Sequence, residues 1–425
     1  MECRNSALCV FDKQAVQTDV LKSTVVEYHP INTLTGEAPI DFEVPGSGDD
    51  YIDLNDINLR LTLQITKGDG TNLVAADKVA LVNLGIASLF SDVAVKVGDT
   101  QVQGGEFNYP YIAYFQTAVQ FQKQAQKTHL KLWGWERDDG GKFDDDSNSG
   151  FVSRLRHVKE SKLYELHGPL FIGIFRQNRY LIPKTPLRIQ LKRALSKFAL
   201  VATAAGDYKV NIHKARLYVR RVTVNPSVIE GHNVGLQKRN AIYPYLHPQL
   251  IIHTAMKDTL ETHRENLFPD AMPRALIIAM VEHVAYTGNL TKNPFNFKNF
   301  DLRRLVLYHN GEIVQGQVFE SNYKDNKYSD VYAQTMSALK MYNTDDSNGI
   351  TYDDFKEGYN FYAFDLTPDG GANDAHRTVS LDTGLRLEMK FGTKLANNVN
   401  ILIFGLFDEF MEITKLRHVM TSVNK

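Results

Sequence analysis

The chain has 425 residues, a length that suits two domains of about 200 residues each. Its 48 Lys and Arg residues balance 49 Asp and Glu residues, so the net charge of −1 excludes a global field that would attract nucleic acid. Apolar residues make up 43% of the chain, but the longest apolar runs, at residues 275–281 and 401–407, are too short to cross a bilayer.

The first 22 residues are polar and lack periodicity, and we interpret them as an N-terminal arm. They contain the two cysteines of the chain, Cys3 and Cys9, so no disulfide can form within the rest of the chain, which fits a reducing compartment. The sequence does not exclude a disulfide between these two cysteines or between two chains. The chain does not begin with a basic region followed by an apolar stretch, so we expect no secretory signal.

Strand patterns follow the arm. Residues 59–66 alternate apolar and polar side chains without interruption, which predicts a β-strand with one buried face. Residues 111–127 lack glycine and proline and predict a helix, residues 138–150 predict an acidic loop, and residues 151–160 predict a short helix. The other strands predicted in this half are residues 25–28, 40–44, 93–97, 163–174, 187–191 and 210–224.

Asn225 and Pro226 form the pair expected at a helix N-cap and first turn, and they predict a linker helix that extends to about Lys238. The second half begins near Ala241, with a helix at residues 329–341 and a short helix after Thr414. Residues 401–404 are apolar on both faces, so their strand should be covered on both sides. The strands predicted in this half are residues 249–256, 275–286, 302–308, 313–319, 360–366, 378–381, 385–391 and 400–410.

The two halves repeat each other. Five pairs of matching segments occur in the same order, at separations of about 190 to 220 residues, and they argue for two copies of one β-rich domain. The pairs are residues 95–99 and 307–312 (strand and tight turn), 114–117 and 332–335 (Tyr-x-Gln-Thr), 145–150 and 345–349 (acidic loop), 185–192 and 383–390 (alternating strand), and 210–212 and 399–401 (Val-Asn-Ile).

About eight strands per copy, with long insertions between some of them, suit a Greek-key sandwich. A jelly roll of two four-stranded sheets fits this count, although periodicity alone leaves an immunoglobulin-like sandwich open. We predict an all-β chain of two tandem eight-stranded jelly-roll sandwiches with short helices in the insertions. The predicted boundaries are an arm at residues 1–22, a first jelly roll at 23–225, a linker helix at 226–240 and a second jelly roll at 241–425.

The stretch at residues 40–54, Ile-Asp-Phe-Glu-Val-Pro-Gly-Ser-Gly-Asp-Asp-Tyr-Ile-Asp-Leu, resembles the N-terminal signature of the double jelly-roll major capsid proteins of Polinton (Maverick) elements and adintoviruses. The resemblance is densest over residues 23–100 and extends through length and layout over the whole chain. It implies that two jelly rolls stand side by side, that three chains form a pseudo-hexagonal capsomer, and that capsomers tile an icosahedral shell around double-stranded DNA.

The resemblance also implies partners and a location. The partners are further copies of the chain, as a homotrimer and then as neighbouring capsomers, together with penton and minor capsid proteins; packaged double-stranded DNA is a less favoured partner. The location is the virion, assembled inside the host cell and not secreted. The family has no catalytic motif, so we expect no enzyme activity, no catalytic, cofactor-binding or metal-binding residue, and no small-molecule substrate.

The histidine, acidic and glycine-containing motifs of the sequence also predict no metal-binding or nucleotide-binding site. His247 and His253 lie six residues apart, with no cysteine or nearby glutamate to complete a metal site. The acidic run at residues 144–148 lacks the glycine and glutamate positions of a calcium loop. Because it recurs in the second half, we expect both acidic loops in a tower at the outer end of the capsomer. Gly46, Ser47 and Gly48 lack the third glycine of a dinucleotide fingerprint and predict a turn.

Four further segments have ordinary interpretations. The basic clusters, Arg154, Arg156, His157, Lys159 and Lys162 in one and Arg216, Arg220 and Arg221 in the other, predict solvated faces or ion pairs between subunits, with packaged DNA as the less favoured contact. Residues 243–248 (Tyr-Pro-Tyr-Leu-His-Pro) predict a kinked interdomain plug. The glycosylation triplet at Asn289 and Thr291 should stay unmodified without a secretory signal.

We therefore predict a structural protein that forms a stable trimer. The alternative is a tandem β-sandwich carbohydrate-binding or host-attachment protein, which would need a groove lined by exposed aromatic residues. A third hypothesis, a metal enzyme on a duplicated cupin-like scaffold, needs a His-x-His and Glu set that the sequence lacks.

Overall fold

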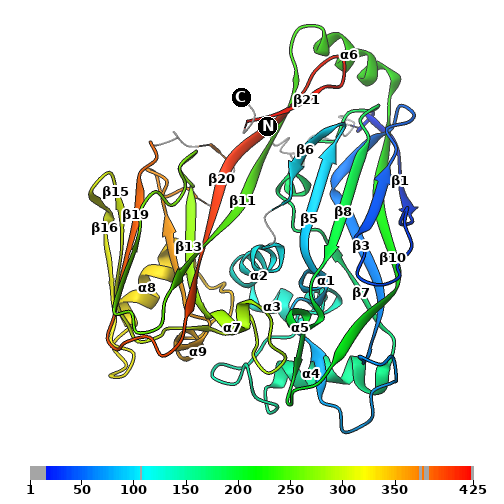
Figure 1. Ribbon diagram of the computed structural model, residues 1–425. Coiled ribbons are helices and arrows are strands. Elements are labelled where there is room, and N and C mark those ends of the chain that lie inside the picture. Colours follow the sequence, from blue (N-terminus) through cyan, green and yellow to red (C-terminus); the bar gives the residue numbers. More distant parts are fainter. Residues whose placement is uncertain (1–15, 106–107, 373–375, 378–381, 423–425) are drawn as a thin grey trace, which may run out of the picture.

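Two β-sandwiches stand side by side in the computed structural model, which describes residues 16–105, 108–372, 376–377 and 382–422 (Figure 1). Helix α6 (Pro226–Leu236) joins them at one end of the molecule, close to residue 16 and to the last described residues. Helices α1 (Gly85–Ser88), α2 (Tyr109–Gln120) and α3 (Lys123–Lys127) lie between the sandwiches.

The first sandwich consists of two four-stranded antiparallel sheets, with the orders β1-β10-β3-β7 and β2-β8-β5-β6. The strands are β1 (Val20–Tyr28), β2 (Ile40–Val44), β3 (Tyr51–Lys67), β5 (Phe90–Val97), β6 (Thr100–Gln103), β7 (Tyr164–Pro169), β8 (Leu187–Arg193) and β10 (Tyr208–Val224). A small separate sheet pairs β4 (Val79–Leu81) with β9 (Leu200–Ala202).

The second sandwich has the sheet orders β11-β20-β13-β18, with β21 added along β20, and β12-β19-β15-β16. The strands are β11 (Ala241–Ala255), β12 (Glu261–Arg264), β13 (Ala275–Glu282), β15 (Leu302–His309), β16 (Glu312–Glu320), β18 (Phe361–Asp365), β19 (Leu385–Phe391), β20 (Val399–Ile413) and β21 (Val419–Thr421). The short strands β14 (Phe297–Lys298) and β17 (Glu357–Gly358) pair beside it.

The two sandwiches share one topology. Taken in chain order, the eight main strands of each sandwich occupy the same places in its two sheets, so that β1, β3, β7 and β10 correspond to β11, β13, β18 and β20. Eight strands in two Greek-key sheets of this order make a jelly roll. The predicted double jelly roll is therefore confirmed, and the immunoglobulin-like alternative is not the fold observed.

The repeated segments of the sequence lie at equivalent places in this topology. The matching alternating strands form β8 and β19, and the two Val-Asn-Ile segments lie in β10 and β20. The two strand-and-turn segments form the hairpins β5–β6 and β15–β16, and the Tyr-x-Gln-Thr motifs lie in α2 and α8 (Ser329–Ala338). The internal repeat of the sequence is therefore a repeat of structure.

Side-chain alternation explains which faces are buried. Leu59, Leu61 and Leu63 of β3 are fully buried in the first sandwich, while the residues between them are more exposed. In β20, by contrast, every residue from Val399 to Phe407 is buried. The prediction that this strand is covered on both sides is confirmed, because a second layer lies against its outer face.

Short helices occupy the insertions, as predicted. Helix α6 begins as the sequence indicates, because the Asn225 side chain accepts a hydrogen bond from the Ser227 backbone N–H and Pro226 occupies the first turn. The remaining helices are α4 (Ser149–Val158), α5 (Ser196–Ala199), α7 (His283–Tyr286) and α9 (Tyr352–Lys356), with 3-10 turns η1 (His129–Trp133), η2 (Lys159–Ser161) and η3 (Gly173–Arg176).

Four predicted elements differ from the structure. The helix predicted at 111–127 is two helices, because the backbone is extended at Phe121, whose ring packs edge-on against Trp133. The strand predicted at 163–174 ends at Pro169 and is followed by η3, and the one predicted at 275–286 ends at Glu282 and is followed by α7. Strand β1 begins at Val20, which pairs with Val224, and not at Val25.

Two more corrections concern the second sandwich. Residues 243–248 are not kinked but form part of β11, an edge strand, where proline is tolerated because its outward backbone groups need no partner strand. The chain after Thr414 makes a turn and then β21, which pairs with β20, and not a helix. The strand predicted at 378–381 lies outside the described residues, as do Cys3 and Cys9.

Candidate assembly surfaces

Helix α2 forms the apolar contact between the sandwiches. All of its residues except Gln120 are buried. The Phe115 ring lies against Phe297, Phe361 and Phe404 of the second half, with ring centroids 5.3, 5.7 and 5.7 Å away. One turn earlier, Tyr111 stacks on Tyr286 at 5.6 Å. Large aromatic rings in such contacts dominate the energy of an interface.

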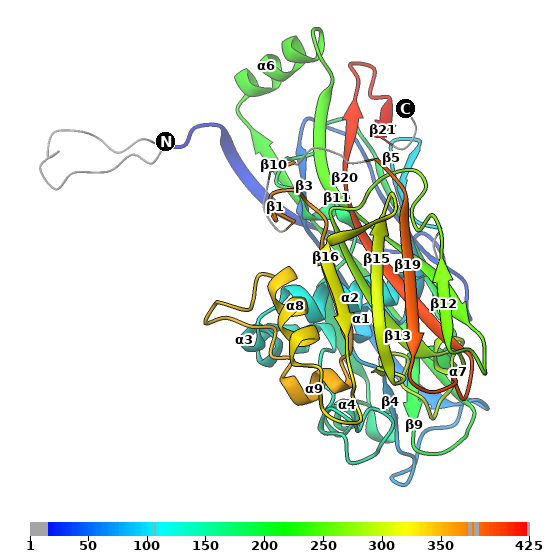
Figure 2. The same ribbon diagram turned by 90° about the vertical axis from the view of Figure 1, so that its left-hand side faces the viewer.

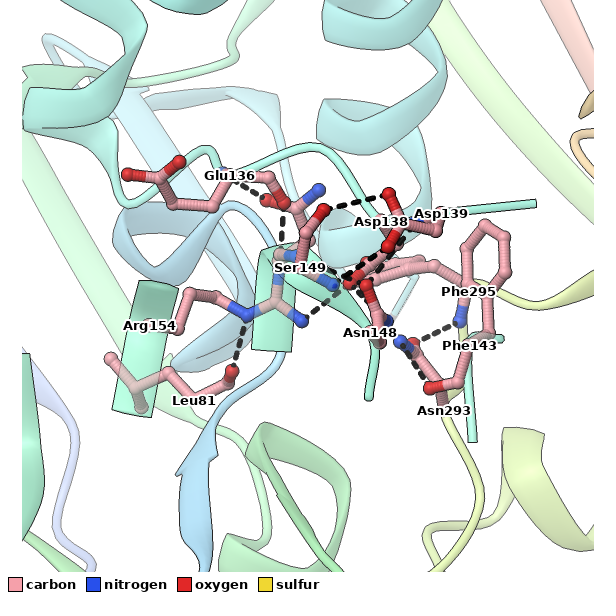
Figure 3. A network of polar contacts seen from close by, with 12 residues as sticks. Leu81, Glu136, Asp138, Asp139, Phe143, Asn148, Ser149, Arg154, Asn293 and Phe295 are labelled. Carbon is pink, nitrogen blue, oxygen red and sulfur yellow. Dashed lines mark hydrogen bonds and ion pairs between the residues drawn. The ribbon is translucent and has the colours of Figure 1, made fainter. Parts of the chain in front are cut away.

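A buried polar network lies beside this contact (Figure 3). Nη2 of Arg154 and Oδ1 of Asp138 are 2.7 Å apart, and the two side chains are 3% and 0% exposed. Arg154 also donates from Nε to the Leu81 carbonyl (2.9 Å) and from Nη1 to the Glu136 carbonyl (2.7 Å). The same Asp138 oxygen accepts from Nδ2 of Asn148 (2.8 Å). These bonds compensate the cost of burying both charges.

The second sandwich attaches to this network from the other side. The Tyr359 hydroxyl donates to the Asp138 carbonyl at 2.8 Å. Asp144 accepts a 2.7 Å hydrogen bond from the backbone N–H of Asn293, which Figure 3 shows beside the network. Arg137 is paired with Asp354 at 2.9 Å. The insertion that carries the first acidic loop therefore fixes the second sandwich in place through polar as well as apolar contacts.

Both acidic loops lie away from α6. The first precedes α4 and the second precedes α9, two helices on the side of the molecule opposite α6 (Figure 1). Asp146 pairs with Lys78 at 2.7 Å, and the hydrogen bond from the Ser147 backbone lowers the pKa of Asp145. In the second loop, the Ser347 carbonyl accepts from the Lys123 backbone (3.1 Å). Their place in an outward tower stays a prediction.

Among the described residues, no second layer covers the outer face of the sheet β1-β10-β3-β7, in contrast to that of its equivalent β11-β20-β13-β18. It carries ion pairs across neighbouring strands, and each of these side chains is 30% to 57% exposed. The hydrogen bond from Arg60 lowers the pKa of Glu165. The pairs are Arg60 with Glu165 (2.9 Å), Arg216 with Glu27 (2.9 Å) and Arg220 with Asp56 (2.5 Å).

Helix α8 is the counterpart of α2 in the second sandwich, since both carry the Tyr-x-Gln-Thr motif. The motif aligns Tyr111 and Phe115, which contact the second sandwich, with Ser329 and Ala333. Ser337 continues this stripe one turn later. Ser329 and Ser337 are exposed and Ala333 is half-buried, so the stripe has small side chains that the described residues leave largely uncovered. We call residues 329, 333 and 337 the α8 stripe.

Strand β11 carries a second contact between the sandwiches, where the sequence predicts an interdomain segment. The Tyr243 hydroxyl accepts from the Ile182 backbone N–H (3.1 Å) and donates to the Tyr180 carbonyl (3.2 Å). Nη1 of Arg179 donates to the Ile242 carbonyl at 2.5 Å. The Gly173 backbone lies so close that an added Cβ would be 2.1 Å from the Leu246 carbonyl oxygen.

His247 and Glu409 form a buried titratable pair on β11 and β20. Nδ1 of His247 lies 4.0 Å from the Glu409 carboxylate, and the side chains are 8% and 9% exposed. Burial lowers the pKa of His247 to about 4 and raises the pKa of Glu409. A 4.0 Å contact would by itself raise the histidine pKa, but at this burial desolvation is the larger effect. The Tyr245 hydroxyl donates to Glu409 (2.9 Å).

The other residues singled out from the sequence are dispersed. His253 bonds to Thr262, far along β11 from the buried pair. The basic residues Arg216 and Arg220 are in ion pairs within the chain, and Arg154 is buried, so the first cluster is not a solvated face as a whole. Asn289 accepts from the Thr291 backbone in a turn. Gly46 to Gly48, predicted to form a turn, lie in the irregular connection between β2 and β3, with a bend at Gly48.

Within the described residues, no group of three or more His, Cys, Asp and Glu side chains is arranged to hold a metal ion. No helix among these residues is long and apolar enough to span a membrane. The buried Asp138–Arg154 pair was not predicted. A signal exists in helix α4, because the spacing of Phe151, Arg154 and Val158 places the arginine on the apolar, buried face.

Comparisons with known proteins agree with this architecture. No known family model matches the chain. The uncharacterized protein F54H12.2 of Caenorhabditis elegans is 21% identical over 400 residues, which cover 91% of this chain and 94% of that protein. A chain of the Sputnik virophage structure has a TM-score of 0.67 at 12% identity and matches 100% of this chain and 92% of its own length.

Two further solved structures are similar over nearly their full length. A chain of the PBCV-1 virus capsid has a TM-score of 0.59 at 8% identity, covering 97% of this chain and 99% of that chain. The mavirus major capsid protein has a TM-score of 0.58 at 12% identity, covering 99% and 94%. The fold is a double jelly roll. At these identities the likeness is one of fold, and it places the chain beside viral capsid proteins in architecture.

Proposed function

We propose that this chain is a major capsid protein, a structural subunit that acts through shape and self-association and not through catalysis. The double jelly-roll fold, shared over nearly the full length with chains of the Sputnik virophage, the PBCV-1 capsid and the mavirus major capsid protein, supports this assignment. The domain boundaries that we propose are the predicted ones, with the linker helix at 226–240 between the two jelly rolls, except that the first jelly roll begins at Val20 with β1 and not at residue 23.

The observation that carries the proposal is the unequal cover of two equivalent sheets. The outer face of β11-β20-β13-β18 is buried by α2 of the same chain, with Phe115 against Phe404. In the described part of the chain, no layer covers the equivalent face of β1-β10-β3-β7, and no sandwich lies against the α8 stripe, which corresponds to the contacting stripe of α2. In the proposed assembly, the α8 stripe of one copy packs on the outer face of β1-β10-β3-β7 of a second copy, so each of these two surfaces gains a partner.

A contact of this kind is head-to-tail, and such contacts close into a ring when the rotation between copies permits it. Three chains with two sandwiches each give six similar wedges around one axis, so the ring is a homotrimer with pseudo-hexagonal outline. The small residues of the α8 stripe let the helix approach the charged sheet face closely. Obligate contacts of this class bury roughly 2,000 Å² or more in total.

The finer parts of the proposal follow from the resemblance at residues 40–54. We propose that the protein belongs to the Polinton (Maverick) or adintovirus type and is located in the virion, with assembly inside the host cell. Its capsomers would tile an icosahedral shell around double-stranded DNA, with penton and minor capsid proteins as further partners. Isolation of a virus-like particle that has this chain as its main component would support this part of the proposal.

Size-exclusion chromatography with light scattering tests the ring. The expected mass is three times the chain mass of 48.2 kDa, about 145 kDa, at micromolar concentration. A monomer under these conditions would contradict the proposal.

A pair of matched variants locates the contact. Ser337→Arg places a long cation in the α8 stripe and should convert the trimer to monomer, because the helix can no longer approach the sheet. Asn233→Arg places the same side chain on the exposed surface of α6 and should leave the trimer intact. Circular dichroism establishes that both variants fold. A trimer that tolerates Ser337→Arg as well as Asn233→Arg would exclude the α8 contact.

A further inference from the structure

The linker helix α6 stands beside a groove of about 820 Å³ that the proposed ring does not use. Residues of β1, β3, β10, α6 and β11 line the groove, with the apolar side chains of Val228 and Leu236 of α6 and Ile242 and Tyr243 of β11 among them and charged side chains such as Arg239 beside them. The Tyr51 hydroxyl lies 2.6 Å from Nδ1 of His232 at the wall of the groove and ties α6 to the first sandwich. The groove is thus a built feature of the linker region.

The segments that line this groove carry exposed apolar side chains. Within α6 only Leu236 is buried, and Val234 is 55% exposed. Ile242, which lines the groove at the start of β11, is 47% exposed. Val16, which precedes β1, and Leu21 of β1 are 80% and 61% exposed, and the residues next to them, Gln17 and Val20, line the groove. An apolar groove with an apolar rim marks a binding surface for an apolar partner.

We propose that this groove binds residues 7–11 of the N-terminal segment, Ala-Leu-Cys-Val-Phe. This run is the most apolar part of the first 15 residues, and its chemistry matches the groove. The chain enters the described region at the groove itself, since Gln17 and Asp19 also line it. The connection from Phe11 to Val16 spans at most about 17 Å, which is enough to reach the groove.

The donor of the segment is either the same chain or a neighbouring copy. Figure 2 shows that β1 leads away from the body of the molecule toward residue 16, so a neighbour's groove is reachable as well. Both arrangements use the same chemistry, and the test distinguishes them. The inference stands independently of the ring, because α6 and the groove lie away from the α8 stripe.

A disulfide-trapping experiment on the full-length chain tests this proposal. The variant carries Cys3→Ser, which leaves Cys9 as the single native cysteine, and Gly231→Cys. Gly231 lines the groove, and a side chain added there meets no atom within 4 Å. The matched control carries Cys3→Ser and Leu163→Cys. Leu163 is 62% exposed and precedes Tyr164 of β7, which pairs with Leu63, toward the opposite end of β3 from Tyr51, the residue that contacts α6.

Mild oxidation should join Cys9 to residue 231 at least about tenfold faster than to residue 163, because binding raises the local concentration of the thiol. Adding Phe11→Asp should remove this advantage. A bridge within one chain assigns the segment to its own groove, and a bridge between chains assigns it to a neighbour. Equal rates at residues 231 and 163, in a sample that still forms trimers, would overturn this inference and leave the proposed ring standing.

Discussion

Replacing Arg154 by methionine tests the buried network between the sandwiches most sharply. The substitution keeps an unbranched side chain of similar length but removes the guanidinium that pairs with Asp138 and donates to the carbonyls of Leu81 and Glu136. Asp138 is then left as a buried carboxylate whose compensating charge is gone.

The expected cost follows from the burial of the pair. With side chains 3% and 0% exposed, the pair belongs to the class in which loss of one partner costs about 3–5 kcal/mol. For 425 residues that unfold as one unit, this corresponds to a decrease in Tm of roughly 3–6 °C. Urea denaturation followed by circular dichroism measures the free energy of unfolding.

A control separates burial from charge. Lys78→Met removes the exposed pair of Lys78 and Asp146, whose side chains are 51% and 46% exposed, and should cost less than about 1 kcal/mol. The double variant Asp138→Asn with Arg154→Met should recover part of the loss, because no unpaired charge remains. If Arg154→Met costs no more than Lys78→Met, the network does not carry the stability that its geometry implies.

Three further predictions concern the contact between the sandwiches. Phe115→Ala removes the ring between three aromatic side chains and should cost about 3–5 kcal/mol in urea denaturation, whereas a loss below 1 kcal/mol would refute the role given to α2. Gly173→Ala should lower Tm more than Gly231→Ala does, because its Cβ would be 2.1 Å from the Leu246 carbonyl oxygen whereas Gly231 has open space; equal Tm values would contradict this close contact. Burial lowers the pKa of His247 to about 4, below the usual 6.5, so the unfolded chain binds the proton first and the contribution of this histidine to the free energy of unfolding falls by up to about 3 kcal/mol as pH falls from 6.5 to 4, while the raised pKa of Glu409 acts in the opposite direction. His247→Gln should flatten this part of a plot of unfolding free energy against pH, and an unchanged slope would argue against a neutral buried imidazole.

The strands and their duplication were predictable from the sequence because they depend on local alternation. Residues 59–66 alternate in the sequence, and their apolar side chains Leu59, Leu61, Leu63 and Ile65 are fully buried, while the doubly apolar run at 401–404 is covered on both sides. The cap at Asn225 is equally local, since its side chain bonds two residues ahead. Repetition of such local patterns in order was sufficient to predict two copies of one fold.

Features that depend on tertiary packing were not predictable in this way. The break between α2 and α3 occurs at Phe121, without glycine or proline, because its ring packs on Trp133. Pro244 suggested a kink, but its place at a sheet edge removes the need for its missing N–H. In the sequence, Arg154 is part of a basic cluster that predicts a solvated face. It is buried with Asp138 because the insertion that carries both residues folds against the second sandwich, which is a tertiary contact.

The central claim is that the open sheet of one chain is covered by the α8 stripe of the next, in a closed ring of three. Electron cryomicroscopy of the purified protein tests this most directly. The account predicts particles with threefold symmetry and six similar lobes, in which α8 lies against the outer face of β1-β10-β3-β7 of the neighbouring chain. Single chains, or assemblies in which both of these surfaces remain exposed to solvent, would contradict it.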